Sequence, residues 1–496
     1  MFDKFPEIVF EGRRLIWDSR QVPNSQGEWV FIPDDSWVNA EIKQKLLSRT
    51  NAKFIGGIGT GLDLEVPNPR NLLGEWASLA LGEPSRKLKV LGVTGTNGKT
   101  TSTAILRALA LATGENVCEL GTLGLQLWES KNPNFPTEII STGFTTPEAP
   151  QLHFLFSQLI KKNVKVVVME VSSHASTLGR ISGVDFDGMV FTNLTQDHLD
   201  FHETLEKYAL AKMKLFTDFL PLSNNQSSKI EISKKSKFAI LNLGGDIAYP
   251  FSAEVQGQIP KSVRVQKFTS GIDFKIINET DLGIEIDIQK QGPLERVGRV
   301  QIPLLGAYNA ENFFGAYLLA SQVFPNLLNF NLQDSVRNFS GVSGRMESVK
   351  TGSRVWVDYA HTPDALEKSL RTLVDLKQNK EKIWIVFGCG GDRDRSKRPL
   401  MGRVASQLAD VIVLTSDNPR SEDPNQIIAE VKNGILNSTS QNFYSEVDRK
   451  RAIEYAIKSR AHGDFVLIAG KGHESVQIFA DKTIEFSDQK IARDFL

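Results

Sequence analysis

Short apolar runs alternate with stretches of helical periodicity along the middle of this chain. The runs are rich in β-branched residues and end in glycine or polar residues, and a helical pattern usually follows. Because a helix crosses back between parallel strands, this alternation predicts a mostly parallel α/β sheet. The predicted strands are Leu88–Val93, Val164–Val171, Gly188–Thr192 and Phe238–Asn242, and the predicted helices are Thr101–Thr113, Gln151–Asn163 and Leu205–Leu220.

A second series of the same kind follows a glycine-containing break at Gly341–Arg345. Its rhythm predicts a Rossmann-like sheet, in which ligands bind beyond the carboxyl ends of the strands. A polar motif follows each strand, so we expect these motifs to meet at one edge of the sheet. The predicted strands are Val355–Asp358, Ile383–Gly388, Val411–Thr415 and Phe465–Ala469.

The chain is too long for a single core, because it has 496 residues and domains usually contain about 100–200. Strand-like pieces at Trp29–Ile32 and Phe54–Ile58 precede a predicted linker at Leu81–Arg86. Alternation around residues 264–303 predicts an antiparallel patch at the edge of the central sheet. We predict an α/β protein with three domains: a small N-terminal α/β domain (1–88), a central P-loop domain with a mostly parallel sheet (89–340) and a C-terminal Rossmann-like domain (341–496).

Composition excludes several classes of protein. Lys plus Arg and Asp plus Glu both number 58, which argues against a nucleic-acid binder or a polybasic membrane protein. The two cysteines, Cys118 and Cys389, lie far apart, which is typical of cytosolic proteins. No signal-like N-terminus and no apolar run of membrane-spanning length is present in the sequence. We therefore expect a soluble, cytoplasmic monomer that acts on small molecules, without a membrane span.

The strongest chemical signal lies in residues 90–101, where an apolar strand runs into Gly95-Thr-Asn-Gly-Lys-Thr100 and a helix. Backbone N–H groups of such a loop bind phosphate, the helix dipole favours the anion, and Lys99 neutralises it. The spacing departs from the common P-loop form because position 93 is valine. The predicted ATP-phosphate residues are Gly95, Thr96, Asn97, Gly98, Lys99, Thr100 and Thr101, with the Thr100 hydroxyl able to hold Mg²⁺.

Two further motifs follow strands of the central domain. Glu170 ends one apolar run, and His198 lies in Asn193-Leu-Thr-Gln-Asp-His after another, so both belong to the rim that carries the phosphate loop. Mg²⁺ prefers oxygen ligands, and the Glu170 carboxylate supplies them. A histidine such as His198 is a less usual ligand for Mg²⁺. The alternative is that Glu170 caps a helix and His198 is an ordinary loop histidine, and the role of His174 stays open.

The full set of motifs resembles the Mur ligase family of ATP-dependent amide-forming enzymes in peptidoglycan precursor synthesis. The resemblance extends along nearly the whole chain. The motifs that carry it are Gly95-Thr-Asn-Gly-Lys-Thr, Thr145-Thr-Pro-Glu, Glu170-Val-Ser-Ser-His, Asn193-Leu-Thr-Gln-Asp-His-Leu-Asp, Gly306-Ala-Tyr-Asn-Ala-Glu-Asn, Asp358-Tyr-Ala-His-Thr-Pro-Asp, Gly388 to Arg398, Asp417-Asn-Pro-Arg and Gly470-Lys-Gly-His-Glu.

The resemblance implies that ATP phosphorylates a carboxylate of a UDP-linked muramoyl dipeptide, and that an amine then attacks the acyl-phosphate. It implies two Mg²⁺ sites and a CO₂-derived carbamate on Lys212, which binds the second metal with Glu170 and His198. Lys99, Glu170, His198 and Lys212 are then the catalytic residues. Without the resemblance, Lys212 would be expected to be a solvated helix residue.

Other substrate contacts are implied in the same way. Asn309 and Asn312 match residues on the adenine side of ATP, while Arg345 and Asp358 match contacts to phosphate and ribose. Phe144 and Leu178 depart from residues common in relatives, and a second substrate loop is not recognisable around residues 33–40. The residues matched to the UDP-linked substrate are Trp17, Ser19, Phe144, Thr145, Thr146, Ser172, Leu178 and Arg180.

The tetrapeptide Asp417-Asn-Pro-Arg420 would by itself be an ordinary turn. In the family it marks members that add meso-diaminopimelate, whose side chain ends in both an amine and a carboxylate. A guanidinium pairs with that carboxylate and repels the ammonium that ends lysine. The residues matched to the amino acid are Arg393, Asp417, Asn418, Pro419, Arg420, Gly470 and Glu474.

Three alternatives remain open at this point. The first is a lysine-adding ligase of the same family. The second is a ligase similar to folylpolyglutamate synthase, which shares the phosphate loop and the amide-forming chemistry. The third is a non-enzymatic P-loop regulator, against which the number of motifs around the phosphate loop argues.

Overall fold

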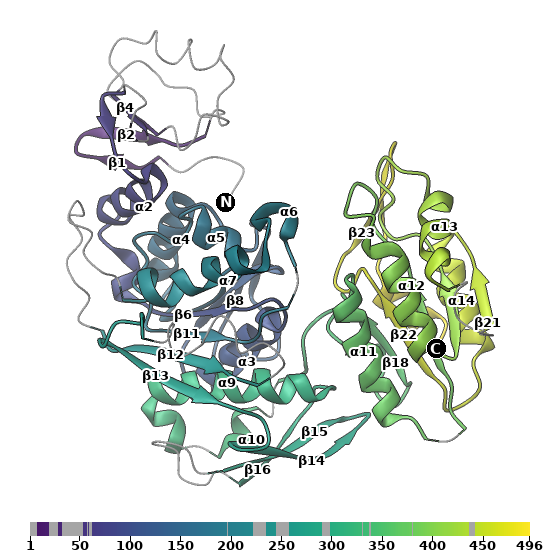
Figure 1. The fold of residues 1–496 in the computed structure, drawn as a ribbon. Coiled ribbons are helices and arrows are strands. Elements are labelled where there is room, and N and C mark those ends of the chain that lie inside the picture. The colour runs from purple at the N-terminus through teal and green to yellow at the C-terminus, as the bar shows by residue number, and fades with distance from the viewer. Residues whose placement is uncertain are drawn as a thin grey trace. The chain divides into compact units, whose positions relative to one another are not determined.

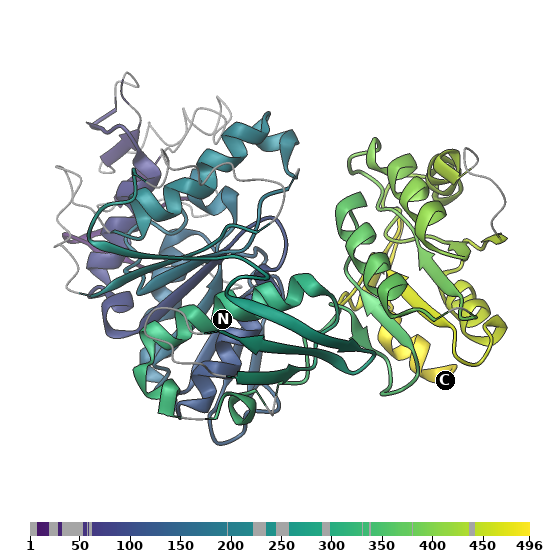
Figure 2. The same cartoon turned by 60° about the horizontal axis from the view of Figure 1, so that its bottom comes forward.

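The computed structural model describes residues 7–18, 28–31, 53–56, 58, 62–195, 197–221, 235–244, 257–289, 298–329, 331–336, 339–378, 380–435 and 442–496. The chain divides into two compact units. One comprises residues 1–270 and 312–338, and the other comprises residues 271–311 and 339–496. Figures 1 and 2 show the ribbon from two directions, with the element labels used below in Figure 1. The domain boundaries expected from the sequence stay predictions.

The N-terminal part contains a small five-stranded sheet. Its order is β1-β2-β3-β4-β5, and only the β1–β2 pair is antiparallel. Helix α2 (Pro69–Ala80) packs on it through Trp76, whose ring stacks on Phe10 at 4.7 Å and meets Phe31 edge-on at 5.7 Å. The strands are β1 (Val9–Phe10), β2 (Arg13–Ile16), β3 (Glu28–Phe31), β4 (Lys53–Gly56) and β5 (Leu64–Glu65).

An eight-stranded sheet forms the centre of the first unit, with the order β13-β12-β11-β6-β10-β7-β8-β9. The four strands expected from the apolar runs are confirmed as parallel neighbours, because each run is buried on both faces of the sheet. The sequence did not reveal the antiparallel extension β8–β9. The strands are β6 (Lys89–Thr94), β7 (Val117–Gly121), β8 (Gly124–Trp128), β9 (Glu138–Ile140), β10 (Val166–Glu170), β11 (Gly188–Phe191), β12 (Lys237–Asn242) and β13 (Val263–Phe268).

Helices flank this central sheet (Figure 1). The predicted helix Leu205–Leu220 is α-helical only to Lys214 and continues as a π-helical segment, η2 (Leu215–Phe219). The predicted linker contains a short 3-10 helix, η1 (Pro84–Lys87), and Nζ of Lys235 donates to the Ser85 carbonyl at 3.0 Å. The helices are α3 (Lys99–Ala112), α4 (Ala149–Lys161), α5 (Ser173–Thr177), α6 (Leu199–His202), α7 (Leu205–Lys214), η3 (Pro325–Asn329) and α10 (Leu332–Ser335).

The antiparallel patch expected at the edge of the central sheet is a separate three-stranded sheet. It comprises β14 (Phe274–Thr280), β15 (Gly283–Ile288) and β16 (Gly298–Ile302), all paired antiparallel. Only β13 from this stretch joins the central sheet, in parallel pairing with β12. Alternation correctly identified these half-buried strands, but it does not specify their partners. Helix α9 (Ala307–Val323) follows them.

The C-terminal unit contains a six-stranded sheet with the order β17-β18-β22-β19-β20-β21. All four predicted strands are confirmed as its parallel centre, and apolar clusters cover both faces. The strands are β17 (Glu347–Ser348), β18 (Val355–Asp358), β19 (Ile383–Phe387), β20 (Val411–Leu414), β21 (Asn442–Ser445) and β22 (Phe465–Ala469). The other elements are α11 (Pro363–Leu376), α12 (Lys397–Leu408), α13 (Pro424–Ile435), α14 (Arg449–Ser459), β23 (Val476–Ile478), β24 (Thr483–Glu485) and α15 (Asp488–Asp494).

Candidate functional site

The phosphate loop joins β6 to α3, and its glycines are required by close packing. Gly98 begins the helix with φ +83°, a conformation that favours glycine. A Cβ atom on Gly98 would lie 2.2 Å from Oδ1 of Asn312, and one on Gly95 would lie 1.9 Å from Oγ1 of Thr192. Thr100 and Thr101 are buried in the first helical turn. The predicted strand–loop–helix arrangement is therefore present.

The segment after β11 holds this loop in place. Oγ1 of Thr192 donates to the Asn97 carbonyl at 2.6 Å, and the Asn97 N–H donates to Oδ1 of Asn193 at 2.9 Å. The backbone N–H of Thr195 donates to Oγ1 of Thr96 at 2.9 Å. The sequence singled out this segment for His198, whereas its threonines and asparagine turn out to brace the loop.

Two lysines converge on the loop. Nζ of Lys99 donates to the carbonyls of Gly95 and Thr96 at 2.9 and 2.7 Å, and Nζ of Lys212 donates to the same Gly95 carbonyl at 2.8 Å. Lys212 is only 1% exposed, so the expectation of a solvated helix residue is wrong. Its burial, together with repulsion from Lys99, lowers the pKa of Lys212 well below its ordinary value.

Glu170 lies at the carboxyl end of β10 and faces the start of α3. Its Oε1 accepts hydrogen bonds from Oγ1 of Thr100 at 3.0 Å and from the Thr122 N–H at 2.9 Å. The alternative role as a helix cap is wrong, because α5 is capped by Ser172, which accepts from the Ala175 N–H at 3.1 Å. A buried carboxylate therefore lies beside the hydroxyl predicted to hold Mg²⁺.

His198 begins α6 with a left-handed φ of +53°. Its ring lies 4.9 Å from that of His174 and 6.1 Å from that of Tyr208, on the helix that carries Lys212. Nε2 of His198 also lies 3.4 Å from Oδ2 of Asp197. The Tyr208 hydroxyl donates to Oγ1 of Thr96 at 3.2 Å. Tyr208 therefore connects His198 to the phosphate loop. A metal-binding role for His198 stays a prediction.

The residues expected around adenine and ribose each contact neighbouring residues of their own unit. Asn312 packs against Gly98 in the first unit, while Nδ2 of Asn309 donates to the Leu305 carbonyl at 2.6 Å in the second. Asp358 accepts hydrogen bonds from the N–H groups of Met346 and Ala360, and burial raises its pKa. The guanidinium of Arg345 lies over the Tyr359 ring at 4.7 Å.

Residues expected to bind the UDP-linked substrate gather near the start of α5. Arg180 forms an ion pair with Glu148 at 2.9 Å, donates to the Thr146 carbonyl at 3.3 Å and lies over the Phe144 ring at 4.5 Å. Thr146 is fully buried and donates to the Glu170 carbonyl at 3.0 Å, and Thr145 precedes it. Phe144, one of the two departures from the family pattern, therefore supports an arginine that the family pattern assigns to substrate.

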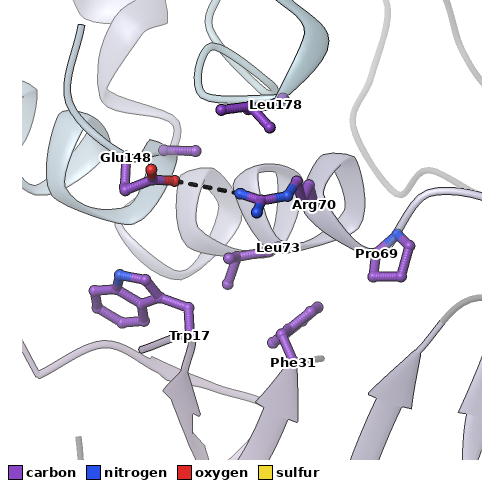
Figure 3. A pocket seen from close by; sticks show the side chains of 9 residues that line it. Trp17, Phe31, Pro69, Arg70, Leu73, Glu148 and Leu178 are labelled. Carbon is purple, nitrogen blue, oxygen red and sulfur yellow. Dashed lines mark ion pairs between the residues drawn. The ribbon is translucent and has the colours of Figure 1, made fainter. Parts of the chain in front are cut away.

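Trp17 and Leu178 line one small pocket between the N-terminal sheet and α2. Figure 3 shows Trp17 and Phe31 projecting from the strands toward Leu73 of α2, with Leu178 on the far side of the helix. Arg70 and Glu148 lie beside this pocket as an ion pair at 3.8 Å. Ser19 and residues 33–40 lie outside the described residues.

The Asp417–Arg420 loop packs closely on the loop after β19. The guanidinium of Arg420 donates to the Gly391 carbonyl at 2.7 Å, and the Pro419 carbonyl leaves no space for a Cβ on Gly391. Asp417 is buried, which raises its pKa, and it fills the space in which a Cβ on Gly470 would lie. Arg393, from the loop after β19, is exposed.

Asn418 and Glu474 form a polar network with a lysine that the motif contained but the sequence did not single out. Nδ2 of Asn418 donates to Oε2 of Glu474 at 2.7 Å. Nζ of the fully buried Lys471 donates to Oδ1 of Asn418 and to Oε2 of Glu474, both at 2.9 Å. Burial alone would raise the pKa of Glu474, but Lys471 and the hydrogen bonds together hold it below its ordinary value. Glu474 is therefore a fixed, ionised carboxylate.

Comparison with known proteins places this geometry in a family. Residues 93–320 match the Mur ligase middle domain, and residues 344–472 match the Mur ligase, glutamate ligase domain. A UDP-N-acetylmuramoyl-L-alanyl-D-glutamate–2,6-diaminopimelate ligase of Geobacillus kaustophilus is 38% identical over 98% of this chain and 94% of its own. The chain belongs to the Mur ligase family. The ligase of that name from Geobacillus thermodenitrificans is 38% identical over 86% of this chain and 83% of its own.

Solved structures agree with this membership. A ligase of the same name has a TM-score of 0.65 and 32% identity, and the match covers 97% of this chain and 94% of that one. The folylpolyglutamate synthase of Mycobacterium tuberculosis, complexed with ADP and AMPPCP, has a TM-score of 0.56 at 17% identity, covering 79% of this chain and 91% of its own. The likeness to the synthase shows a shared fold only. The family matches and the first of these structures confirm the Mur ligase fold expected from the sequence.

In the described part of this Mur ligase, no group of three or more His, Cys, Asp or Glu side chains is arranged to hold a metal ion. No helix in the same ranges has the length and apolar character needed to cross a membrane.

A buried ion pair beneath the site was missed from the sequence. Nη1 of Arg107 donates to Oε2 of Glu119 at 2.9 Å, and the guanidinium lies over the Trp128 ring at 3.7 Å. Oγ1 of Thr103 bridges Oε1 of Glu119 and the Thr100 carbonyl at 3.2 and 2.9 Å. The only sequence signal was a glutamate inside an apolar strand. The pair connects β7 to the helical turn that carries Thr100.

A second buried pair fixes the amino-acid loops. Arg449 binds both carboxylate oxygens of Asp488 at 2.8 and 2.7 Å, and donates to the carbonyls of Ser416 and Ala469 at the ends of β20 and β22. The substitution Asp488→Asn leaves the buried arginine uncompensated, so we expect a loss of about 3–5 kcal/mol in the free energy of unfolding. Urea denaturation measures it, with Asp494→Asn on the exposed side of α15 as the control. Equal midpoints for the two variants would contradict this role.

Proposed function

We propose that this Mur ligase joins meso-2,6-diaminopimelate to UDP-N-acetylmuramoyl-L-alanyl-D-glutamate at the expense of ATP. The observation that carries the proposal is the Asp417–Arg420 loop. It places Arg420 next to a fixed network of Asn418, Lys471 and Glu474 at the carboxyl ends of β20 and β22. The named relatives, similar over most of the chain, support the same substrate.

The phosphate loop and its surroundings fit ATP with Mg²⁺. Gly95 and Gly98 allow the loop to pack directly against Thr192 and Asn312, and Thr100 and Glu170 present oxygen atoms at the start of α3. When bound, Mg²⁺ supplies positive charge that neutralises the phosphates during transfer. Lys99 exchanges its bonds to the Gly95 and Thr96 carbonyls for the phosphate oxygens. The loop itself stays in place through Asn193 and Thr195.

Lys212 fits a role as a carbamate. An amine attacks CO₂ only in its neutral form, and burial lowers the pKa of Lys212 well below its ordinary value. The nitrogen forms a bond to the carbon of CO₂ and releases one proton, which turns a buried cation into an oxygen ligand. This change also removes the repulsion between Lys212 and Lys99 at the Gly95 carbonyl. The environment therefore favours the modified form.

The reaction then proceeds in two balanced steps. The D-glutamate carboxylate attacks the γ-phosphorus of ATP, and ADP leaves, which yields an acyl-phosphate. The amine of diaminopimelate attacks the acyl carbon and loses a proton, and inorganic phosphate leaves as the amide forms. Arg180, held by Glu148 over Phe144, is suited to orient the UDP-linked substrate, and the buried Thr146 fixes the strand end beside Glu170.

Substrate selectivity gives the direct test of this proposal. A charge-assisted contact from Arg420 to the distal carboxylate is worth about 1.5–3 kcal/mol, and lysine places an ammonium there instead. We expect the kcat/KM for meso-diaminopimelate to exceed that for L-lysine by about a hundredfold or more, since 1.4 kcal/mol is about tenfold. Phosphate release with each amino acid measures this ratio.

The variant Arg420→Ala should raise the KM for diaminopimelate much more than the KM for ATP. Arg403→Ala, which removes an exposed arginine of α12, is the matched control and should leave both unchanged. Comparable kcat/KM values for lysine and diaminopimelate in the unmodified protein would contradict the substrate assignment. Unchanged diaminopimelate kinetics in Arg420→Ala would contradict the role of the arginine.

The remaining parts of the proposal concern where the protein acts. A cytoplasmic monomer fits the soluble nucleotide-linked substrates and the balanced charge of the chain, with 58 basic and 58 acidic residues. In the proposed three-domain division, with boundaries at residues 88/89 and 340/341, the first domain binds the UDP-linked substrate together with Arg180 of the central domain. The central domain binds ATP, and the third binds the diamino acid. Limited proteolysis with mass spectrometry of the fragments tests these boundaries.

A further inference from the structure

A second cavity lies between α2, α5 and the end of α7. Its volume is about 410 Å³, within the range of small-molecule pockets. None of the residues proposed above to bind ATP, the UDP-linked substrate or the diamino acid lines it. The residues that give it chemical character are Asn71, Glu75, Ser176, Lys214 and Asp218.

Glu75 presents a carboxylate to this cavity from α2. It is half-buried, and it forms no hydrogen bond or ion pair with any described residue. Burial raises its pKa to about 7, and no neighbouring charge contributes to that shift. A cationic group brought into the cavity would therefore gain an ion pair for which the protein itself supplies no partner.

Lys214 lines the same cavity from the end of α7. It lies two residues beyond Lys212 on α7, so it projects from a different face of the helix, and it is exposed. It forms no ion pair with any described residue, and it does not lower the pKa of Glu75. Opposite charges thus line one cavity without neutralising each other, although the side chain of Asp218 lies beside them.

One uncharged group adds hydrogen-bonding capacity. Oδ1 of Asn71 accepts from the Ser182 hydroxyl at 2.8 Å, which orients the amide and leaves Nδ2 to donate elsewhere.

We propose that this cavity binds a small zwitterion of the amino-acid or dipeptide class. Its ammonium group pairs with Glu75 and its carboxylate with Lys214, while Asn71 adds a hydrogen bond. A polyanion such as a nucleotide is disfavoured because Glu75 and Asp218 repel it. A simple cation leaves Lys214 without a partner. The inference does not depend on the proposed ligase activity.

Titration calorimetry on the full chain with L-alanine, L-glutamate and glycylglycine tests the proposal. At least one of these zwitterions should bind, and the analogues propionate and ethylamine, each lacking one charge of alanine, should bind at least about tenfold more weakly. Glu75→Gln and Lys214→Met should each weaken binding by about tenfold or more. Lys161→Met, which removes an exposed lysine of α4, is the matched control and should bind normally.

The variant Arg420→Ala separates this cavity from the proposed diaminopimelate site. Zwitterion binding that persists in Arg420→Ala and is lost in Lys214→Met supports the cavity. Absence of binding for all three zwitterions, or binding that is lost in Arg420→Ala and retained in Lys214→Met, would overturn it. Because Lys214 is exposed, its replacement should leave the fold intact, and circular dichroism with the unfolding midpoint checks this.

Discussion

Replacing Lys212 with alanine is expected to lower substrate-dependent phosphate release by about a hundred- to thousandfold. The expectation follows from the position of the side chain, which is 1% exposed and reaches the Gly95 carbonyl of the phosphate loop at 2.8 Å. As a carbamate it would supply a metal ligand that no other described residue replaces, and the loss of one preorganised charged group typically costs about a hundred- to thousandfold.

Three comparisons isolate the carbamate from simple charge. Lys212→Arg keeps a cation but cannot take up CO₂ in this way, so it should be as inactive as Lys212→Ala. A small carboxylate such as formate should restore part of the activity of Lys212→Ala only. Lys214→Ala, two residues away and exposed, should turn over normally. An active Lys212→Ala enzyme, or a ¹³C-bicarbonate spectrum of the native protein without a carbamate resonance, would remove the modification from the mechanism.

The second large effect is expected for Lys99. Its ammonium lies at the mouth of the phosphate loop, 2.9 and 2.7 Å from the carbonyls of Gly95 and Thr96. Removing it with Lys99→Ala takes away the positive charge at the transferred phosphoryl group. We expect the barrier to rise by about 3 kcal/mol, which lowers kcat by more than about a hundredfold.

The measurement is steady-state phosphate release, with the fold confirmed by circular dichroism. Lys161→Ala serves as the control because it removes an exposed lysine outside the site. Calorimetry of ADP binding adds a second readout. The loss of a transition-state contact should lower kcat more than it lowers the affinity for ADP. Turnover of Lys99→Ala near the native rate would show that the phosphate-loop assignment is wrong.

The sequence predicted the parallel strands well for a physical reason. β10 and β19 are buried along their whole lengths, so each appears as a continuous apolar run that helix or loop segments do not imitate. Strands whose partners lie elsewhere were harder to place. β14–β16 were expected at the edge of the central sheet, yet alternation records only which face is buried and not which strand lies beside it.

In the candidate site too, features set by a local pattern could be predicted, whereas contacts between distant segments could not. Residues within compact motifs, such as Lys99 and Glu170, were placed correctly because a strand end or helix start fixes them. Without the family resemblance, Lys212 would have been expected in solvent, since a helical pattern does not reveal that a lysine faces a distant loop. The partners Arg107–Glu119 and Arg449–Asp488 belong to different elements, and no local pattern connects them.

The bonds that brace the phosphate loop also set the order in which the protein can acquire nucleotide binding during synthesis. Thr96 is held by Thr195, 99 residues further along the chain, and Gly95 is contacted by Lys212, 117 residues further along. Contacts between distant residues form late, because the intervening chain must first be ordered. A nascent chain that ends before Lys212 therefore carries every residue of the loop motif but lacks one of the side chains that hold it. Competence to bind nucleotide should therefore not appear before α7 has left the ribosome.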